Sequence, residues 1–260
     1  MRPLLTGGVA LPGRVPVLAA LGVVISVAWA YLLWMAWGMA NMDAGAAMLL
    51  MPRMSGWGAA DVALVALMWT VMMVAMMLPT ALPMVLAYRA AQQRRNAASA
   101  ARHVTAFVAG YLAVWTGFSV TVTLLQWALL ESGAVSPMMA LRDPRAAGAL
   151  LIAAGLYQAS PLKRACLASC QSPLMFLMTC WRPGVGGAWR MGLQHGLWCT
   201  GCCWLLMALL FVLGVMNLAW IAALTLFVLV EKGWPRARWL GSLSGLLLVG
   251  WGVTLVATAV

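Results

Sequence analysis

Long apolar runs alternate with short polar segments along most of the chain. A helix needs about 17 to 25 apolar residues to cross the hydrocarbon core of a bilayer. Five such runs are clear, at residues 16–37, 62–87, 104–130, 197–215 and 239–258. The first is longer than the roughly 7 to 15 apolar residues of a secretory signal peptide, so we expect it to be retained as a helix.

Two shorter runs, 146–159 and 218–230, bring the count to seven. About 14 helical residues at 1.5 Å each cover only ~21 Å of a ~30 Å core unless flanking residues join in. The pattern therefore predicts an all-α fold, a polytopic transmembrane helical bundle of about seven spans, with six as the alternative count.

Composition agrees with a lipid environment. Hydrophobic residues make up 65% of the chain and charged residues 8%, whereas about a quarter of the residues of a soluble domain are charged. The net charge of +11 does not indicate nucleic acid, because the basic residues sit in short segments between apolar runs, where they act as topology signals. We expect the lipid bilayer as a partner and no nucleic acid.

The distribution of basic residues predicts the orientation. With the N-terminus in the cytoplasm, thirteen Lys and Arg residues fall in cytoplasmic segments: Arg2, Arg14, Arg89, Arg94, Arg95, Arg102, Lys163, Arg164, Arg182, Arg190, Lys232, Arg236 and Arg238. Three fall outside: Arg53, Arg142 and Arg145. This asymmetry follows the positive-inside rule through every loop, and seven spans then place the C-terminus outside.

No linker or long soluble segment divides the chain, so we expect a single integral membrane domain over residues 1–260. The longest stretch between spans is Ser160–Gln194. It contains the apolar segment Leu174–Trp181 between proline-containing breakers, which predicts an interfacial or re-entrant helix.

Acid–base groups are scarce in the predicted spans. Asp61 and Glu231 lie at predicted helix ends and His103 at the foot of the third span, so no carboxylate occupies a span centre. This disfavours a proton-coupled pump. Phosphate-binding loops are also missing from the sequence, which disfavours ATP-driven transport by this chain, and we predict that it is not an enzyme.

Sulfur is the element in excess, with 20 Met and 6 Cys. One methionine group lies at the outer end of the first span: Met35, Met39, Met42, Met48, Met51 and Met54. In the second span Met68, Met72 and Met76 fall within a stripe of about 80°, with Met73 and Met77 on the same half of the helix. Such a stripe predicts a ladder of thioether ligands or, as the alternative, flexible core packing. Pro79 and Pro83 are predicted to interrupt this helix.

The cysteines strengthen the metal hypothesis. Cys166 and Cys170 are four residues apart in the loop before the fifth span, which opens with His195, Cys199, Cys202 and Cys203. On a continuous helix the imidazole and the first two of these thiols lie within about 60°. Thiolate, thioether and imidazole favour Cu(I), with zinc as the second choice. Structural packing and thiol redox chemistry are the alternatives, whereas disulfides fit poorly in the reducing cytoplasmic half.

Several of these segments resemble one family. They are the run Trp69–Pro79, Tyr157 and Gln158 with Pro161–Lys163, Cys166 and Cys170, the segment Gly192–Trp204, and Met216 and Asn217 with Glu231 and Lys232. Together, over about residues 60–235, they resemble a bacterial family of predicted metal-binding integral membrane proteins of unknown function. The resemblance implies metal binding through Met, Cys and His in a bacterial inner membrane. It implies no substrate or mechanism.

The leading hypothesis is a multi-pass membrane protein that binds Cu(I) and transports, inserts or senses it. The metal site would comprise Cys166, Cys170, His195, Cys199, Cys202, Cys203, Met68, Met72 and Met76. A metal chaperone or other membrane subunits are the expected partners. The rival hypotheses are an accessory subunit of a larger membrane complex, in which Met, Trp and Gly serve packing, and a membrane thiol-redox enzyme.

Overall fold

The computed structural model describes residues 14–41, 56–136, 140–234 and 238–259. Over these ranges the chain is helical, apart from loops and one isolated antiparallel bridge between Val135 and Leu141. The helices are α1 Arg14–Ala40, α3 Ala59–Arg95, α4 Ala100–Glu131, α5 Pro144–Gln158, α6 Pro161–Gln171, α7 Pro173–Cys180, α8 Gly184–Ala208, α9 Leu210–Leu213, α10 Leu218–Gly233 and α11 Arg238–Thr258. The all-α prediction is confirmed for this part of the chain.

Five helical segments in the described ranges are long and apolar enough to cross a membrane: Val15–Gly38, Ala59–Arg95, Ala100–Glu131, Gly184–Leu213 and Trp239–Thr258. They correspond to the five long runs of the sequence. The two short runs form α5 and α10, of 15 and 16 residues. Each is about 22 to 24 Å long at 1.5 Å per residue, so the count of seven spans stays a prediction.

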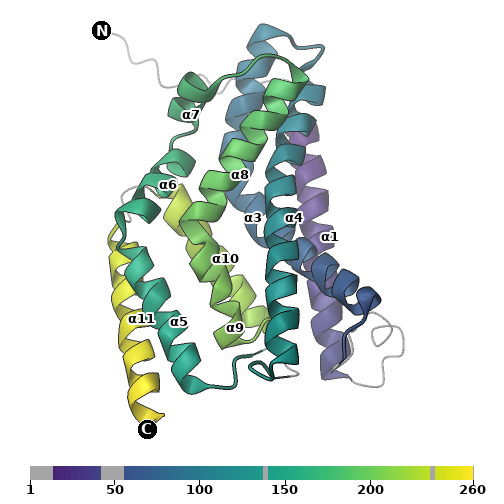
Figure 1. Ribbon diagram of the computed structural model, residues 1–260. Coiled ribbons are helices and arrows are strands. Elements are labelled where there is room, and N and C mark those ends of the chain that lie inside the picture. The colour runs from purple at the N-terminus through teal and green to yellow at the C-terminus, as the bar shows by residue number, and fades with distance from the viewer. Residues whose placement is uncertain (1–13, 42–55, 137–139, 235–237, 260) are drawn as a thin grey trace.

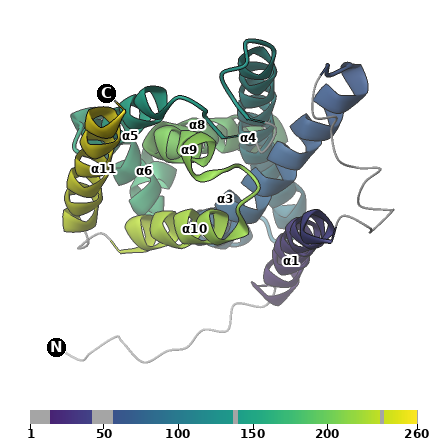
Figure 2. The same cartoon turned by 90° about the horizontal axis from the view of Figure 1, so that it is seen from below.

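The long helices run roughly side by side (Figure 1). α4 packs along α8 on one side and α3 on the other, and α1 packs against α3. The yellow α11 pairs with α5 at the opposite edge of the molecule, and the view from below places α10 between this pair and α1 (Figure 2). The junction of α3 and α4 lies at one end of the bundle, whereas the connection from α4 to α5 lies at the other.

Glycines allow two of these helix pairs to approach closely. A Cβ added to Gly192 of α8 would lie 2.0 Å from the carbonyl oxygen of Phe107 in α4. In the other pair, a Cβ added to Gly155 of α5 would lie 2.6 Å from the carbonyl oxygen of Gly245 in α11. Backbone contact through small residues is the usual packing mode of membrane helices, where the hydrophobic effect does not drive association.

α3 continues through both of its prolines, so the prediction that they interrupt this helix was wrong. Pro79 has no N–H, which leaves the carbonyl of Ala75 without its helical partner. The indole nitrogen of Trp29 in α1 donates to that carbonyl oxygen at 3.2 Å. A neighbouring helix thus satisfies the freed backbone group.

α8 begins earlier than the sequence suggested. Its first residue is Gly184, 13 residues before the predicted start of the fifth span. This first part has a low hydropathy because it contains Arg190, Gln194 and several glycines. The pattern of apolar runs therefore did not include it in the predicted span. The cysteines therefore lie in the second half of a long helix and not at its opening. The apolar segment before α8 forms the short helix α7, as predicted, although its place in an interface is untested.

Candidate metal centre

The second half of α8 presents three thiols to the core. Cys199, Cys202 and Cys203 are each 1% exposed, and spacings of three and four residues place them on one helical face. The thiols of Cys202 and Cys203 each donate to the carbonyl oxygen of Cys199 at 3.0 Å. The continuous helix that the sequence argument assumed is therefore present here.

α6 adds two cysteines from another part of the chain. Cys170 is half-buried and packs against the core cluster that contains Cys199, Cys202 and Cys203. Cys166 is buried against α8, since a Cβ added to Gly201 would lie 2.9 Å from its Sγ. We call Cys166, Cys170, Cys199, Cys202 and Cys203 the thiol cluster. The structure thus brings together all five cysteines that the sequence assigned to the site.

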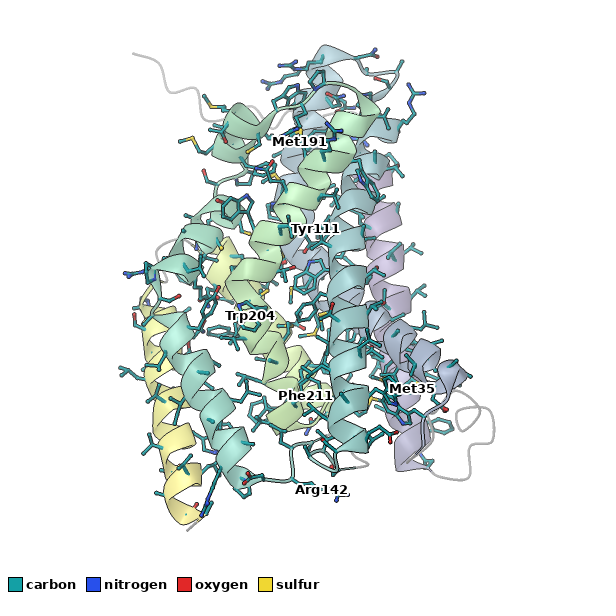
Figure 3. All side chains as sticks on the ribbon, viewed as in Figure 1. Met35, Tyr111, Arg142, Met191, Trp204 and Phe211 are labelled. Atoms are coloured by element: carbon teal, nitrogen blue, oxygen red, sulfur yellow. The ribbon has the colours of Figure 1, made fainter. Side chains whose placement is uncertain are left out.

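Helices α3, α4 and α10 meet the thiol cluster at Cys199. The Lys232 ammonium group of α10 donates to Cys199 Sγ at 2.9 Å and to Thr80 Oγ1 at 3.2 Å. The Tyr111 hydroxyl, at middle height in Figure 3, lies 3.1 Å from the same sulfur and donates to the Met77 carbonyl oxygen at 3.0 Å. Thr80 Oγ1 donates to that carbonyl at 2.8 Å. These contacts close a ring of hydrogen bonds that includes the sulfur.

Lys232 places a positive charge beside the thiols. It is only 7% exposed, and the neighbouring carboxylate, Glu231, pairs instead with Lys163 at 2.7 Å. A buried cation is costly unless a negative group lies nearby. Cysteines of the thiol cluster are the groups whose negative charge would stabilise it. An adjacent ammonium group favours the thiolate, which is the form of cysteine that binds metal.

Lys232 was not predicted as a site residue from the sequence, because it was assigned to the cytoplasmic end of a helix. Lysine at the end of an apolar run is ordinarily an interfacial residue. Its burial depends on α10 packing against α3 and α8, which no local pattern reveals. The adjacent Glu231 was assigned to the same helix end, and it too is buried.

The methionine stripe of α3 is buried, but a different methionine reaches the thiols. Met77 Sδ lies 3.9 Å from Cys203 Sγ. Met76 is fully buried yet points about 100° away around the helix. Met68 and Met72 lie farther down α3, where they line a small cavity. The identity of the methionine at the thiol cluster depends on which helix faces α3, and the spacing alone could not give it.

His195 lies one helical turn before Cys199 among aromatic rings. Its ring centroid is 5.6 Å from that of Tyr111, 6.0 Å from Phe107 and 5.5 Å from Phe176. The imidazole is buried, and its Nδ1 has no hydrogen-bond partner among the described residues. A buried polar atom without a partner is costly, so this nitrogen is available to a ligand.

The donors form a cluster without a preformed metal geometry. Over the described ranges, no three His, Cys, Asp or Glu side chains are arranged to hold an ion. The thiols of Cys202 and Cys203 instead donate to the Cys199 carbonyl. Metal binding here would therefore displace thiol protons and rotate side chains. The available donors, which are thiol, thioether and imidazole, suit a soft ion such as Cu(I) or zinc.

A cavity of about 540 Å³ lies on the other side of α6. Its walls include Gln158, Lys163, Arg164, Glu231 and Ser242, from α5, α6, α10 and α11. Polar groups thus lie beside the thiol cluster with only α6 between them. The Lys163–Glu231 ion pair ties α6 to α10 at this wall.

Fold and site together define a class of protein: a bundle of apolar helices that encloses soft metal donors and a buried lysine. A family model described as PpoB2, copper chaperone, matches residues 66–255. The match covers most of the chain, so the protein belongs to this copper chaperone family. Searches of curated proteins and of solved structures returned no match. Family membership supports a copper-related function.

Proposed function

We propose that the protein is an integral membrane protein that binds Cu(I) as cargo and passes it to another protein. The thiol cluster carries this proposal, because it packs cysteines of α6 and α8 together beside the thiolate-favouring charge of Lys232. Membership of the copper chaperone family supports copper over zinc, the second choice.

The proposed ligands are those expected from the sequence. They are Cys166, Cys170, His195, Cys199, Cys202, Cys203, Met68, Met72 and Met76. The thiol contacts support the cysteines, and the unpartnered Nδ1 of His195 supports the imidazole. Met77 joins them through its contact with Cys203. Thioethers would receive the ion weakly and thiolates hold it more tightly, which gives the transfer a direction.

The proposed setting is a bacterial inner membrane. We propose one membrane domain with seven spans, a cytoplasmic N-terminus and no catalytic activity. The expected partners are a metal chaperone or membrane subunits that receive the ion. Five long apolar helices support insertion into a membrane, and the asymmetry of the basic residues supports the orientation.

Copper content tests the function. Cys199→Ser and Cys202→Ser should each lower the Cu(I) bound to detergent-purified protein at limiting copper by at least about tenfold, because losing a ligand costs more than the 10- to 100-fold typical of its supporting groups. Elemental analysis measures the effect. Cys180→Ser is the matched control, since Cys180 lies in α7 and packs in a separate core region.

Equal copper content in all three variants would contradict the proposal and make the cysteines packing residues. Thiol trapping in cells tests the redox alternative on the same variants. A redox enzyme would cycle one pair of these cysteines between thiol and disulfide, whereas a Cu(I) carrier keeps them reduced.

A further inference from the structure

Four methionines from three separate segments line one small cavity in the half of the bundle away from α7. They are Met35 of α1, Met68 and Met72 of α3, and Met216 in the turn between α9 and α10. The remaining lining residues are aliphatic: Leu32, Ala36, Val215, Leu218 and Ile221. Figure 3 places Met35 toward the end of the molecule opposite Met191.

The lining of the cavity suits a soft ion better than water. Its volume is about 10 Å³, close to the minimum of roughly 10 to 15 Å³ that one water molecule needs. A water there would also need two to four polar partners, whereas every lining side chain is apolar or a thioether. Thioether sulfur is a ligand for Cu(I) and a poor one for magnesium or calcium.

Met216 lies in a tight turn between α9 and α10. Gly214 has a φ of +89°, in the left-handed region that favours glycine, and the Asn217 amide donates to its carbonyl oxygen at 3.1 Å. Met216 is only half-buried, whereas Met35, Met68 and Met72 are buried. The site therefore has one methionine at its rim and three in its interior.

We infer that Met35, Met68, Met72 and Met216 form a second, thioether-only Cu(I) site that feeds the thiol cluster. The inference rests on the proposed function, because a feeding site needs a receiving one. From Met72 to Met77 is five residues, or about 7.5 Å along α3, and Met77 Sδ contacts Cys203 Sγ. Buried methionine sulfur thus connects the two sites along a single helix.

Silver ion is the probe for this site, because Ag(I) is a redox-stable soft ion of the same charge as Cu(I). The intact protein, labelled with ¹³C in the methionine methyl groups, is titrated with Ag(I) in detergent and followed by NMR. The methyl signals of the four site methionines should shift along one common curve. Met84, a buried methionine elsewhere on α3, supplies a signal that should stay in place.

A double variant, Met35→Leu with Met216→Leu, tests the geometry. Leucine conserves volume and usually costs less than about 1.5 kcal/mol in a packed core, so the fold should be kept. Two of four ligands are lost, and the affinity that Met68 and Met72 report should fall at least about tenfold. Met84→Leu is the matched control and should leave the titration unchanged.

Unshifted methyl signals, or an unchanged curve in the double variant, would overturn the thioether site. The copper bound by the cysteines is measured on the same preparation. This measurement distinguishes failure of the methionine site from failure of the proposed function. If that copper is retained, the failure concerns the methionine site alone and the proposed function stands. If Cys199→Ser also leaves copper unchanged, the proposed function fails as well.

Discussion

At the scale of single residues, Lys232 places a positive charge 2.9 Å from the Cys199 sulfur. A protonated amine buried against sulfur favours the thiolate by charge attraction, which is strong away from water. A bound Cu(I) ion brings a positive charge to the same place. Under the proposed function, Lys232 would favour the loss of thiol protons that Cu(I) binding requires.

Lys232→Gln should weaken copper binding at the thiol cluster. The amide keeps a hydrogen-bond donor but loses the charge, and a loss of about 1.4 kcal/mol is a tenfold change in affinity, so we expect a fall of at least about tenfold. Competition with a Cu(I)-specific chelator measures it. Arg190→Gln removes an exposed positive charge from α8 and should have no effect; an equal fall in both variants would contradict a local role for Lys232.

At the scale of helices, the contact between α6 and α8 sets the distance between the cysteines of α6 and those of α8. Gly201 lies directly under Cys166, and its carbonyl oxygen accepts a hydrogen bond from the Tyr157 hydroxyl of α5. A glycine at this point allows three helices to meet around the thiols. Any side chain there would push α6 outward.

Gly201→Ala should lower copper affinity without unfolding the protein. The new Cβ would lie 2.9 Å from Cys166 Sγ, so the thiol must move, while alanine is favoured over glycine in a helix by about 1 kcal/mol. Thermal unfolding and copper binding are measured together. Gly186→Ala, with open space around its Cβ on the same helix, should not change binding. Unchanged affinity in Gly201→Ala would show that the α6 cysteines do not ligate.

The cysteine face of α8 could be read from the sequence because a helix repeats every 3.6 residues and the face lies within one helix. Lys232 and Met77 could not be found this way, because their contacts with Cys199 and Cys203 join segments far apart in the chain. Met216 could not be found this way either, because it meets residues of α1 and α3 only in the folded chain. A motif within one helix is a local property, whereas a site shared by several helices depends on how they pack.

At the scale of the whole molecule, the long apolar runs were sufficient to predict the five long helices. The ends of the helices were harder to predict, since Arg190 and Gln194 interrupt the apolar pattern of α8 without ending the helix. The outer methionines Met42, Met48, Met51 and Met54 lie outside the described residues. Their position at the outer end of the first span therefore stays a prediction.

The orientation is tested with reporter fusions. Fusions after Arg95 and within residues 182–190 should report the cytoplasm, while fusions at Val135 and at the C-terminus should report the outside. The reason is the excess of basic residues in the predicted cytoplasmic segments. Alkaline phosphatase and fluorescent-protein reporters give opposite signals in the two compartments. A cytoplasmic C-terminus would mean that α5 or α10 does not cross the membrane.

The glycine contact between α5 and α11 can form only after a delay during synthesis. α5 is completed at Gln158, whereas its close partner α11 begins at Arg238, 80 residues later. At 5 to 20 residues per second, a ribosome needs roughly 4 to 16 s for that stretch. During this interval the short α5 lacks the helix that fits Gly148 and Gly155. α11 supplies Gly241 and Ser242 to the wall of the polar cavity beside α6, so this cavity is complete only after α11 has been synthesised.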